Sequence, residues 1–227
     1  MTDSMDKVRL VVGAGIIERV IPDAEQALKI YKKITDYTYL DYLPVTPRDL
    51  VVPEDLAVTL ALNSRVGSKA VESLMEKRSI SLAGLPDKPL EAADDNDLEA
   101  AADQIMVLVG LKGFGASVTS KLLHKKRPAL IPVMDNSAIF GAYMNPDWPQ
   151  KKAGSDTVKD RKLILEALRR IRFDITRPEN EGVWARLGKD REMRSRIELF
   201  DCVWWGWFKQ KTRNSYQERM DKEGRIE

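Results

Sequence analysis

The segment of residues 107–135, VLVGLKGFGASVTSKLLHKKRPALIPVMD, constrains the fold more than any other part of the chain. An apolar helical pattern ends in a tight turn around Gly113, Phe114 and Gly115, and a second helical pattern follows. Glycine has no Cβ atom, so two glycines around one apolar residue let the backbone turn sharply and approach another group closely. The segment therefore predicts two helices joined by a compact hairpin, whose N–H groups and helix N-terminus can face an anion.

A lone carboxylate, Asp135, ends this segment. A basic break at residues 125–128 separates the second helix from a short apolar run, and Asp135 stands where the next helical pattern begins. Aspartate is a preferred N-cap residue because its side chain accepts hydrogen bonds from the first N–H groups of a helix. By itself, this position predicts a helix cap.

Apolar residues at helical spacing account for most of the chain. They recur every three or four positions, and Pro22 is well placed to open the first helix. Residues 8–12 form the only plausible strand. The sequence predicts an all-α protein with two closely packed helical lobes, in which residues 1–227 form a single domain. The predicted helices cover residues 24–34, 56–62, 68–77, 97–109, 117–124, 135–143, 157–171 and 190–212.

Composition excludes several classes of protein and of site. No run reaches the roughly 18 consecutive apolar residues of a membrane-spanning helix, and the N-terminus lacks a signal-peptide pattern. A cytoplasmic, nucleoid-associated protein is expected. The single cysteine, Cys202, and the single histidine, His124, exclude a disulfide framework and a four-cysteine metal site. A catalytic Cys202–His124 pair is the alternative, but a free cysteine in an apolar helical pattern usually packs in a core.

Charge is distributed unevenly along the chain, although the net charge is only +2. Residues 87–103 contain seven acidic residues and one basic residue. Residues 104–172 contain thirteen Lys and Arg against five Asp and Glu, a net charge of +8. A basic section around the hairpin is expected for a protein that binds a polyanion. The alternative is an ordinary solvated surface of mixed charge.

Residues 107–139 resemble the helix-hairpin-helix (HhH-GPD) DNA glycosylase superfamily. Members of that superfamily carry an L-P-G-[VI]-G hairpin, small residues in the following helix, and a catalytic aspartate beyond that helix. The chain departs from the pattern at Lys112, which replaces the usual proline. The residues that match are Leu111, Gly113, Phe114 and Gly115 in the hairpin, Thr119 and Ser120 at the small positions, and Asp135 at the catalytic position.

The resemblance implies an all-α glycosylase-like fold and an enzyme that flips and excises a damaged or modified base from double-stranded DNA. A carboxylate at Asp135 would stabilise the positive charge that develops on the sugar and would help to activate water. The flipped base must be held by contacts to the flanking phosphates. The expected DNA-binding residues are Lys112, Gly113, Phe114, Gly115, Ser117, Lys121, His124, Lys125, Lys126 and Arg127.

Two further sites follow from the resemblance and from the aromatic residues. The resemblance implies that backbone carbonyls near Val109, Leu111 and Phe114 can bind a monovalent cation; no other cofactor is expected. Aromatic faces stack on flipped bases, so Tyr39, Tyr42 and Trp205 are candidates for a base pocket. Trp204 and Trp207 lie on the apolar face of the last helix, where core packing is the commoner role.

Ser117 predicts a monofunctional enzyme. Members of the superfamily that also nick the strand place a lysine there, which forms a Schiff base. Lys121 lies four residues further on, on the same helix face, and could reach the site, but a phosphate contact is the role we expect for it. Base excision in repair and defence against modified foreign DNA are equally compatible with these residues. The alternatives are a non-catalytic helix-hairpin-helix DNA-binding module and an all-α interaction scaffold. We expect a monomer.

Overall fold

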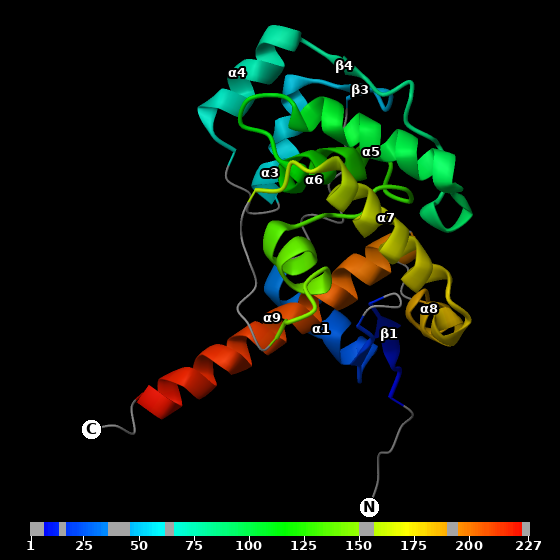
Figure 1. Ribbon diagram of the computed structural model, residues 1–227, viewed down its shortest axis with the longest axis vertical. Helices are drawn as coiled ribbons and strands as arrows, with labels where there is room; N and C mark the ends of the chain where they lie inside the picture. The colour runs from blue at the N-terminus through cyan, green and yellow to red at the C-terminus, as the bar shows by residue number, and fades with distance from the viewer. Residues whose placement is uncertain are drawn as a thin grey trace, which may run out of the picture.

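The computed structural model describes residues 7–13, 17–35, 46–61, 66–149, 157–189 and 195–223, and helices make up most of them. The prediction of a helical protein is confirmed. Figure 1 shows one group of helices in the upper part of the molecule, with α7 (Arg161–Thr176) running from it towards a second group below. The lower group is built around α1 (Ala24–Thr35) and α9 (Arg196–Glu223).

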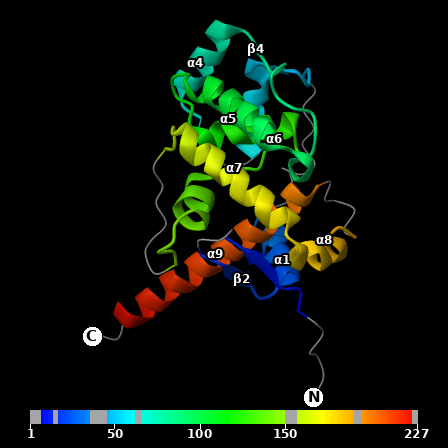
Figure 2. The same ribbon diagram turned by 45° about the vertical axis from the view of Figure 1, so that its right-hand side comes forward.

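The upper group contains the predicted hairpin and the chain that packs against it (Figure 2). The capping of α5 explains its start, because Asp94 accepts a hydrogen bond from the Asp97 amide at 3.0 Å and Asp97 accepts one from the Asp94 amide at 2.8 Å. The elements are β3 (Leu50–Val51), η1 (Pro53–Leu56), α3 (Ala57–Ala61), α4 (Ser68–Lys77), β4 (Ile80–Ser81), η2 (Leu90–Ala92), α5 (Asp95–Val109) and α6 (Ala116–Lys126).

Two short antiparallel strand pairs add to the helices. The predicted strand within residues 8–12 is β1 (Leu10–Val12), and it pairs with β2 (Arg19–Ile21), which the sequence did not predict. The second pair joins β3 and β4, with Val51 opposite Ile80. The sequence missed β2, β3 and β4 because each has only two or three residues, too few to show an alternating pattern.

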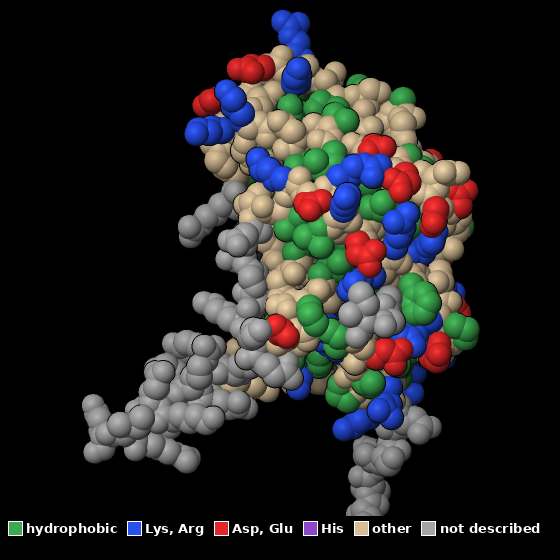
Figure 3. Space-filling view, in the orientation of Figure 1, with side chains coloured by type: hydrophobic (Ala, Val, Ile, Leu, Met, Phe, Trp, Pro, Cys, Tyr) green, Lys and Arg blue, Asp and Glu red, His purple; other side chains and the backbone are tan. Residues whose placement is uncertain are grey.

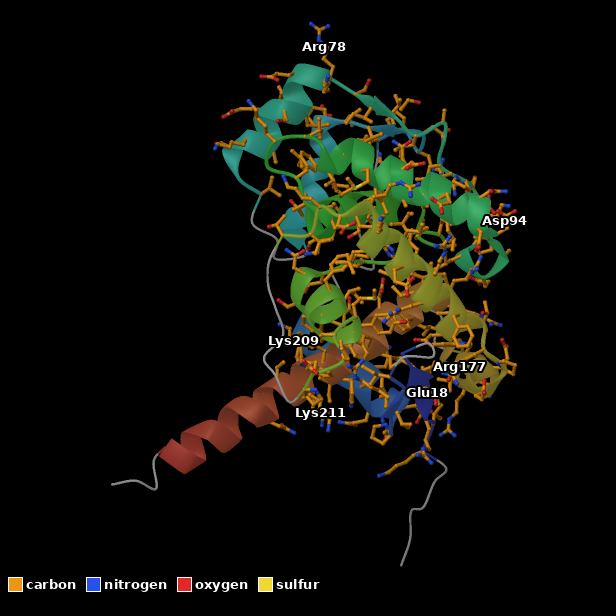
Figure 4. All side chains as sticks on the ribbon, in the orientation of Figure 1. Glu18, Arg78, Asp94, Arg177, Lys209 and Lys211 are labelled. Carbon is orange, nitrogen blue, oxygen red and sulfur yellow. The ribbon has the colours of Figure 1, made fainter. Side chains whose placement is uncertain are left out.

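Buried polar contacts fasten the first strand pair to the lower group. The Gly13 amide donates to the Asp174 carboxylate at 2.7 Å, and the Arg19 guanidinium donates to the Tyr143 carbonyl at 3.2 Å. Figure 4 labels Arg177 and Glu18, which form an ion pair at 2.8 Å beside these contacts. The first strand pair is therefore an integral part of the core.

The lower group contains three more elements between α6 and α9: η3 (Asn136–Tyr143), η4 (Pro178–Asn180) and α8 (Glu181–Leu187). The predicted helix over residues 157–171 begins at Arg161, because Asp160 caps it through the Lys162 amide at 2.8 Å. The end of α9 projects beyond the body of the molecule in both ribbon views (Figures 1 and 2). No helix among the described residues is long and apolar enough to cross a membrane.

An aromatic cluster fills the core beside α9. Trp204 and Trp207 are buried, as predicted, and both pack against Trp148 with ring centroids 5.8 and 5.3 Å from its ring. Helices α1 and α9 approach each other closely at Gly206, where a Cβ atom would lie 2.1 Å from the Ala27 carbonyl oxygen. Only glycine lets the two backbones come this near.

The uneven charge of the sequence is largely balanced within the fold. Arg161 on α7 pairs with Glu99 and Asp103 on α5, each at 2.6 Å. Arg172, one helix turn from the end of α7, pairs with Asp95 at 2.8 Å. On the face seen in Figure 3, basic and acidic side chains are interspersed rather than gathered by sign. Part of the basic section that suggested a polyanion partner is therefore explained by ion pairs between two neighbouring helices.

Candidate active site

The hairpin between α5 and α6 has the tight geometry that the two glycines predict. Gly113 has a φ of +83°, which glycine adopts easily, and a Cβ atom there would lie 2.6 Å from the Ala70 backbone nitrogen. The buried Phe114 donates its amide to the Leu111 carbonyl at 3.2 Å. The hairpin is thus pressed against the first turn of α4, and Lys112 and Gly113 remain exposed at its tip.

The N-terminus of α6 is less open than an anion site requires. The Ala116 amide donates to the Val158 carbonyl at 3.0 Å, and a Cβ atom on Gly115 would lie 2.4 Å from the Thr157 methyl group. Residues 157 and 158 therefore cover this side of the hairpin. For the predicted cation, the Leu111 carbonyl already accepts one hydrogen bond, so an ion there would share that oxygen.

Several residues expected to contact DNA are buried instead. Lys126 is 1% exposed and pairs with the buried Asp55 at 2.9 Å, while Arg127 is 4% exposed and pairs with Asp49 at 2.5 Å. The ring of His124 is buried, and its Nδ1 lies 2.5 Å from the Ile131 carbonyl oxygen. Burial lowers the pKa of His124 to about 4, so its side chain is neutral near pH 7. The prediction of phosphate contacts by these three side chains does not fit their positions.

A smaller set of the predicted residues keeps access to solvent. Lys112 and Gly113 are exposed, and Ser117 and Lys125 are partly exposed. Phe114 and Gly115 are buried and support the hairpin from within. A polyanion could therefore reach the hairpin tip and one face of the first turn of α6.

Asp135 caps η3, as its sequence position predicts. Its Oδ1 accepts hydrogen bonds from the amides of Ser137 and Ala138 at 2.8 and 2.9 Å. The helix that follows is a π-helix: the Phe140 amide reaches back to the Asp135 carbonyl at 3.3 Å. The two side-chain bonds hold the carboxylate rigidly, and the residue is partly exposed.

Two side chains hold the chain leading to Asp135: Ser120, which the resemblance places at a small position, and Asp201, which the sequence did not single out. The Ser120 hydroxyl on α6 accepts a hydrogen bond from the Met134 amide at 2.9 Å. The Asp201 carboxylate on α9 accepts one from the Val133 amide, also at 2.9 Å. No sequence signal identifies these partners, because each is distant along the chain from the amide that it binds. Together they dock the segment before Asp135 between α6 and α9.

This docking brings Lys121 next to Asp135. Lys121 follows Ser120 on α6, and Asp135 follows Met134, whose amide Ser120 binds. Lys121 is only 7% exposed. Burial lowers the pKa of its amine, and the nearby Asp135 charge opposes this shift in part. The predicted phosphate contact is therefore replaced by an internal position beside the candidate catalytic acid.

One buried polar atom next to Asp135 has no hydrogen-bond partner among the described residues. The Asn136 Oδ1 is buried and accepts no hydrogen bond from the part of the chain that the structure describes. Buried polar atoms are nearly always satisfied, so an exception calls for an explanation, and a ligand group is one. Asn136 thus joins Asp135 and Lys121 in a cluster of polar groups.

The predicted base pocket receives little support. Tyr39 and Tyr42 lie outside the described residues. Trp205 is partly buried and packs edge-to-face on Tyr31 of α1, with centroids 5.6 Å apart. The amine of Lys209, which Figure 4 labels on α9, lies 4.8 Å from the Trp205 ring centroid. These contacts assign Trp205 to the α1–α9 interface.

The model of a family of unknown function (DUF6308) matches residues 31–207. The chain belongs to the DUF6308 family. The match spans the hairpin, Lys121 and Asp135, so the whole candidate site lies within the DUF6308 region. No curated protein and no solved structure matches the chain.

Proposed function

We propose that this protein is a DNA N-glycosylase that excises a damaged or modified base from double-stranded DNA, with Asp135 as its catalytic carboxylate. The placement of Asp135 is the observation that carries the proposal. Its carboxylate accepts hydrogen bonds from two amides, and the residue is partly exposed. It lies next to a buried amine and beyond a glycine hairpin whose tip is exposed. The resemblance of residues 107–139 to the HhH-GPD superfamily supplies the reaction class.

Cleavage of an N-glycosidic bond requires a catalytic carboxylate that is rigid and charged. Breaking an N-glycosidic bond places positive charge on the sugar, and a fixed carboxylate stabilises that charge without having to reorganise. Both amide hydrogen bonds end on Oδ1, so Oδ2 is the oxygen that can face the sugar or a water molecule. The capping role and the catalytic role are therefore compatible in one side chain.

The π-helix after Asp135 supports a functional role for this region. A π-helical turn is rare, and such turns occur frequently at functional sites. In η3 the irregular turn begins at Asp135, and the Trp204 indole secures it by donating to the Ala138 carbonyl at 2.8 Å. The irregular turn thus starts at the proposed catalytic residue.

DNA would be held at the hairpin tip. Lys112 and Gly113 are exposed there, and Ser117 lies in the first turn of α6. An exposed lysine charge binds phosphates without reading sequence. Fewer side chains can contact phosphates than the sequence predicted, because Lys126 and Arg127 form ion pairs within the protein.

Base release from a panel of duplexes carrying damaged or modified bases tests the proposal. The variant is Asp135→Asn, which keeps a capping oxygen but removes the charge. The matched control is Asp160→Asn, because Asp160 caps α7 through two amides in the same way, at 2.8 and 3.4 Å. We expect the wild type and Asp160→Asn to release base, and Asp135→Asn to remain folded but to lose about 100-fold or more of the rate.

Two results would contradict the proposal. If Asp135→Asn releases base at the wild-type rate, Asp135 is only a cap. If the wild type binds duplex DNA in a salt-dependent manner but releases base from no member of the panel, the non-catalytic DNA-binding module is the better description.

A further inference from the structure

We propose that the projecting part of α9, at residues 209–214, is a second contact surface for the phosphate backbone of double-stranded DNA. This inference rests on the proposed function for the choice of partner, and it adds a surface that the hairpin and Asp135 do not include. Three features of the helix support it: its unpaired positive charge, its polar side chains and its place in the fold.

Positive charge gathers at this end of α9. Residues 202–214 contain three basic residues and no acidic residue. Lys209 and Arg213 lie one helix turn apart on the same face, and both are exposed. Neither forms an ion pair with another residue that the structure describes. Their charges differ in this respect from those of Lys126 and Arg161, which are balanced inside the fold.

The contacts of Lys209 hold its charge in place without neutralising it. Its amine lies 4.8 Å from the Trp205 ring centroid and 6.0 Å from that of Phe208, as the label on α9 in Figure 4 helps to locate. An aromatic ring attracts a cation through its quadrupole but has no net charge. The ammonium therefore keeps its full charge at a restricted position, which lowers the entropic cost of a contact with a phosphate.

The polar side chains of this segment favour DNA over a membrane surface. Its exposed residues are basic or carry an amide: Lys209, Gln210, Lys211, Arg213 and Asn214. The preceding aromatic residues, Trp207 and Phe208, are buried. A helix that lies in a membrane interface needs an exposed apolar face beside its basic residues, and residues 209–214 do not provide one. Basic and amide side chains are those that contact a phosphate backbone.

An acidic side chain, Asp23, lies near this surface. It lines a pocket together with Gln210 and Asn214, on the face of α9 next to that of Lys209 and Arg213. Its Oδ1 accepts a hydrogen bond from the Gln26 amide at 2.9 Å and so caps α1. The face that carries the two cations is therefore turned away from this carboxylate.

The place of α9 in the fold brings this surface near the proposed active site. The Trp204 indole donates to the Ala138 carbonyl, so α9 packs directly on η3, the helix that Asp135 caps. In both ribbon views η3 lies on the side of the molecule towards which α9 projects (Figures 1 and 2). A duplex that reaches Asp135 can thus extend along the projecting helix.

The experiment measures the affinity of the full chain for an unmodified duplex over a salt series, so it does not depend on base excision. The variant is Lys209→Gln with Arg213→Gln, since glutamine is a good helix former and removes only the charge. We expect the slope of log affinity against log salt concentration to fall by about two. The matched control is Lys29→Gln with Lys33→Gln, two exposed lysines one turn apart on α1 that form no ion pair with described residues. It should keep the wild-type slope.

The outcomes separate this inference from the proposed function. A smaller slope in the α9 variant alone supports the inference, even if the protein releases base from no duplex. A wild-type slope in the α9 variant, or an equal reduction in both variants, overturns it, and base release by the same preparation would leave the glycosylase proposal standing. Vesicles that contain phosphatidylserine are the second probe. If the α9 variant loses binding to these vesicles but binds duplex DNA as the wild type does, the surface belongs to a membrane contact instead.

Discussion

The Lys126 ammonium lies 2.9 Å from the Asp55 carboxylate, and the two side chains are 1% and 4% exposed. The same ammonium donates to the Thr46 hydroxyl at 2.6 Å and to the Pro47 carbonyl at 2.9 Å. In the sequence, residues 125–127 look like a phosphate-binding run. In the structure, Lys126 instead joins the end of α6 to the segment before η1. This finding separates the basic residues that hold the fold from those that remain available to a ligand.

We expect Lys126→Met to destabilise the protein by about 3–5 kcal/mol, because it leaves the buried Asp55 carboxylate without its counter-charge. Urea denaturation measures the change. The control is Arg186→Met, which breaks an ion pair with Glu25 whose partners are 41% and 37% exposed, and which should cost less than about 1 kcal/mol. Equal, small losses in the two variants would show that the Lys126–Asp55 pair does not stabilise the fold.

Lys112 should contribute to DNA binding through charge alone. Lys112→Ala is expected to lower duplex affinity and to reduce the slope of log affinity against log salt concentration by about one, since one phosphate contact is lost. Fluorescence anisotropy over a salt series measures both quantities. Lys189→Ala, an exposed lysine after α8, should leave the slope unchanged. The same reduction in both variants would indicate a diffuse charge effect and no site at the hairpin.

The buried His124 predicts a loss of stability in mild acid. Its pKa is lowered from 6.5 to about 4 in the folded state, so the unfolded chain takes up the proton first as the pH falls. Stability should therefore decrease by about 2 kcal/mol between pH 7 and pH 5, and the loss should continue until the folded pKa is reached. Because His124 is the only histidine, His124→Gln should flatten this part of the stability profile. An unchanged profile would mean that His124 is not held neutral.

Gly206 should not tolerate a side chain. Gly206→Ala places a Cβ atom 2.1 Å from the Ala27 carbonyl oxygen, so α1 and α9 must separate, and we expect a loss of about 1–3 kcal/mol. Gly182→Ala is the matched control in α8, where a Cβ atom meets open space; it should stabilise the helix by about 0.5–1 kcal/mol. Thermal unfolding distinguishes the two. An unchanged thermal stability of Gly206→Ala would show that α1 and α9 do not approach each other this closely.

Local sequence was sufficient wherever the determining contacts are local. The hairpin at Gly113 follows from the backbone freedom of glycine, and the cap at Asp135 follows from the hydrogen-bonding reach of aspartate to amides two and three residues ahead. Apolar spacing located most helices to within a few residues. The last helix, predicted over residues 190–212, spans Arg196–Glu223 instead, and α8 was not predicted. Apolar spacing could not locate β2, whose three residues pair with β1 by contacts that leave no periodic pattern.

The sequence alone therefore determined a helical protein with a tight glycine hairpin and an acid at the start of a helix, because each of these depends on neighbours along the chain. Only the tertiary structure decided which charges remain available. Lys126 and Arg161 are paired with Asp55 and Glu99, which lie far from them in sequence, whereas Lys112 is left exposed. It also set Lys121 beside Asp135, since the hydrogen bond that docks the two segments joins α6 to a chain that returns after a turn. Ion pairing, burial of charged side chains and the proximity of Lys121 to Asp135 all arise from packing between distant segments, which composition and local patterns do not reveal.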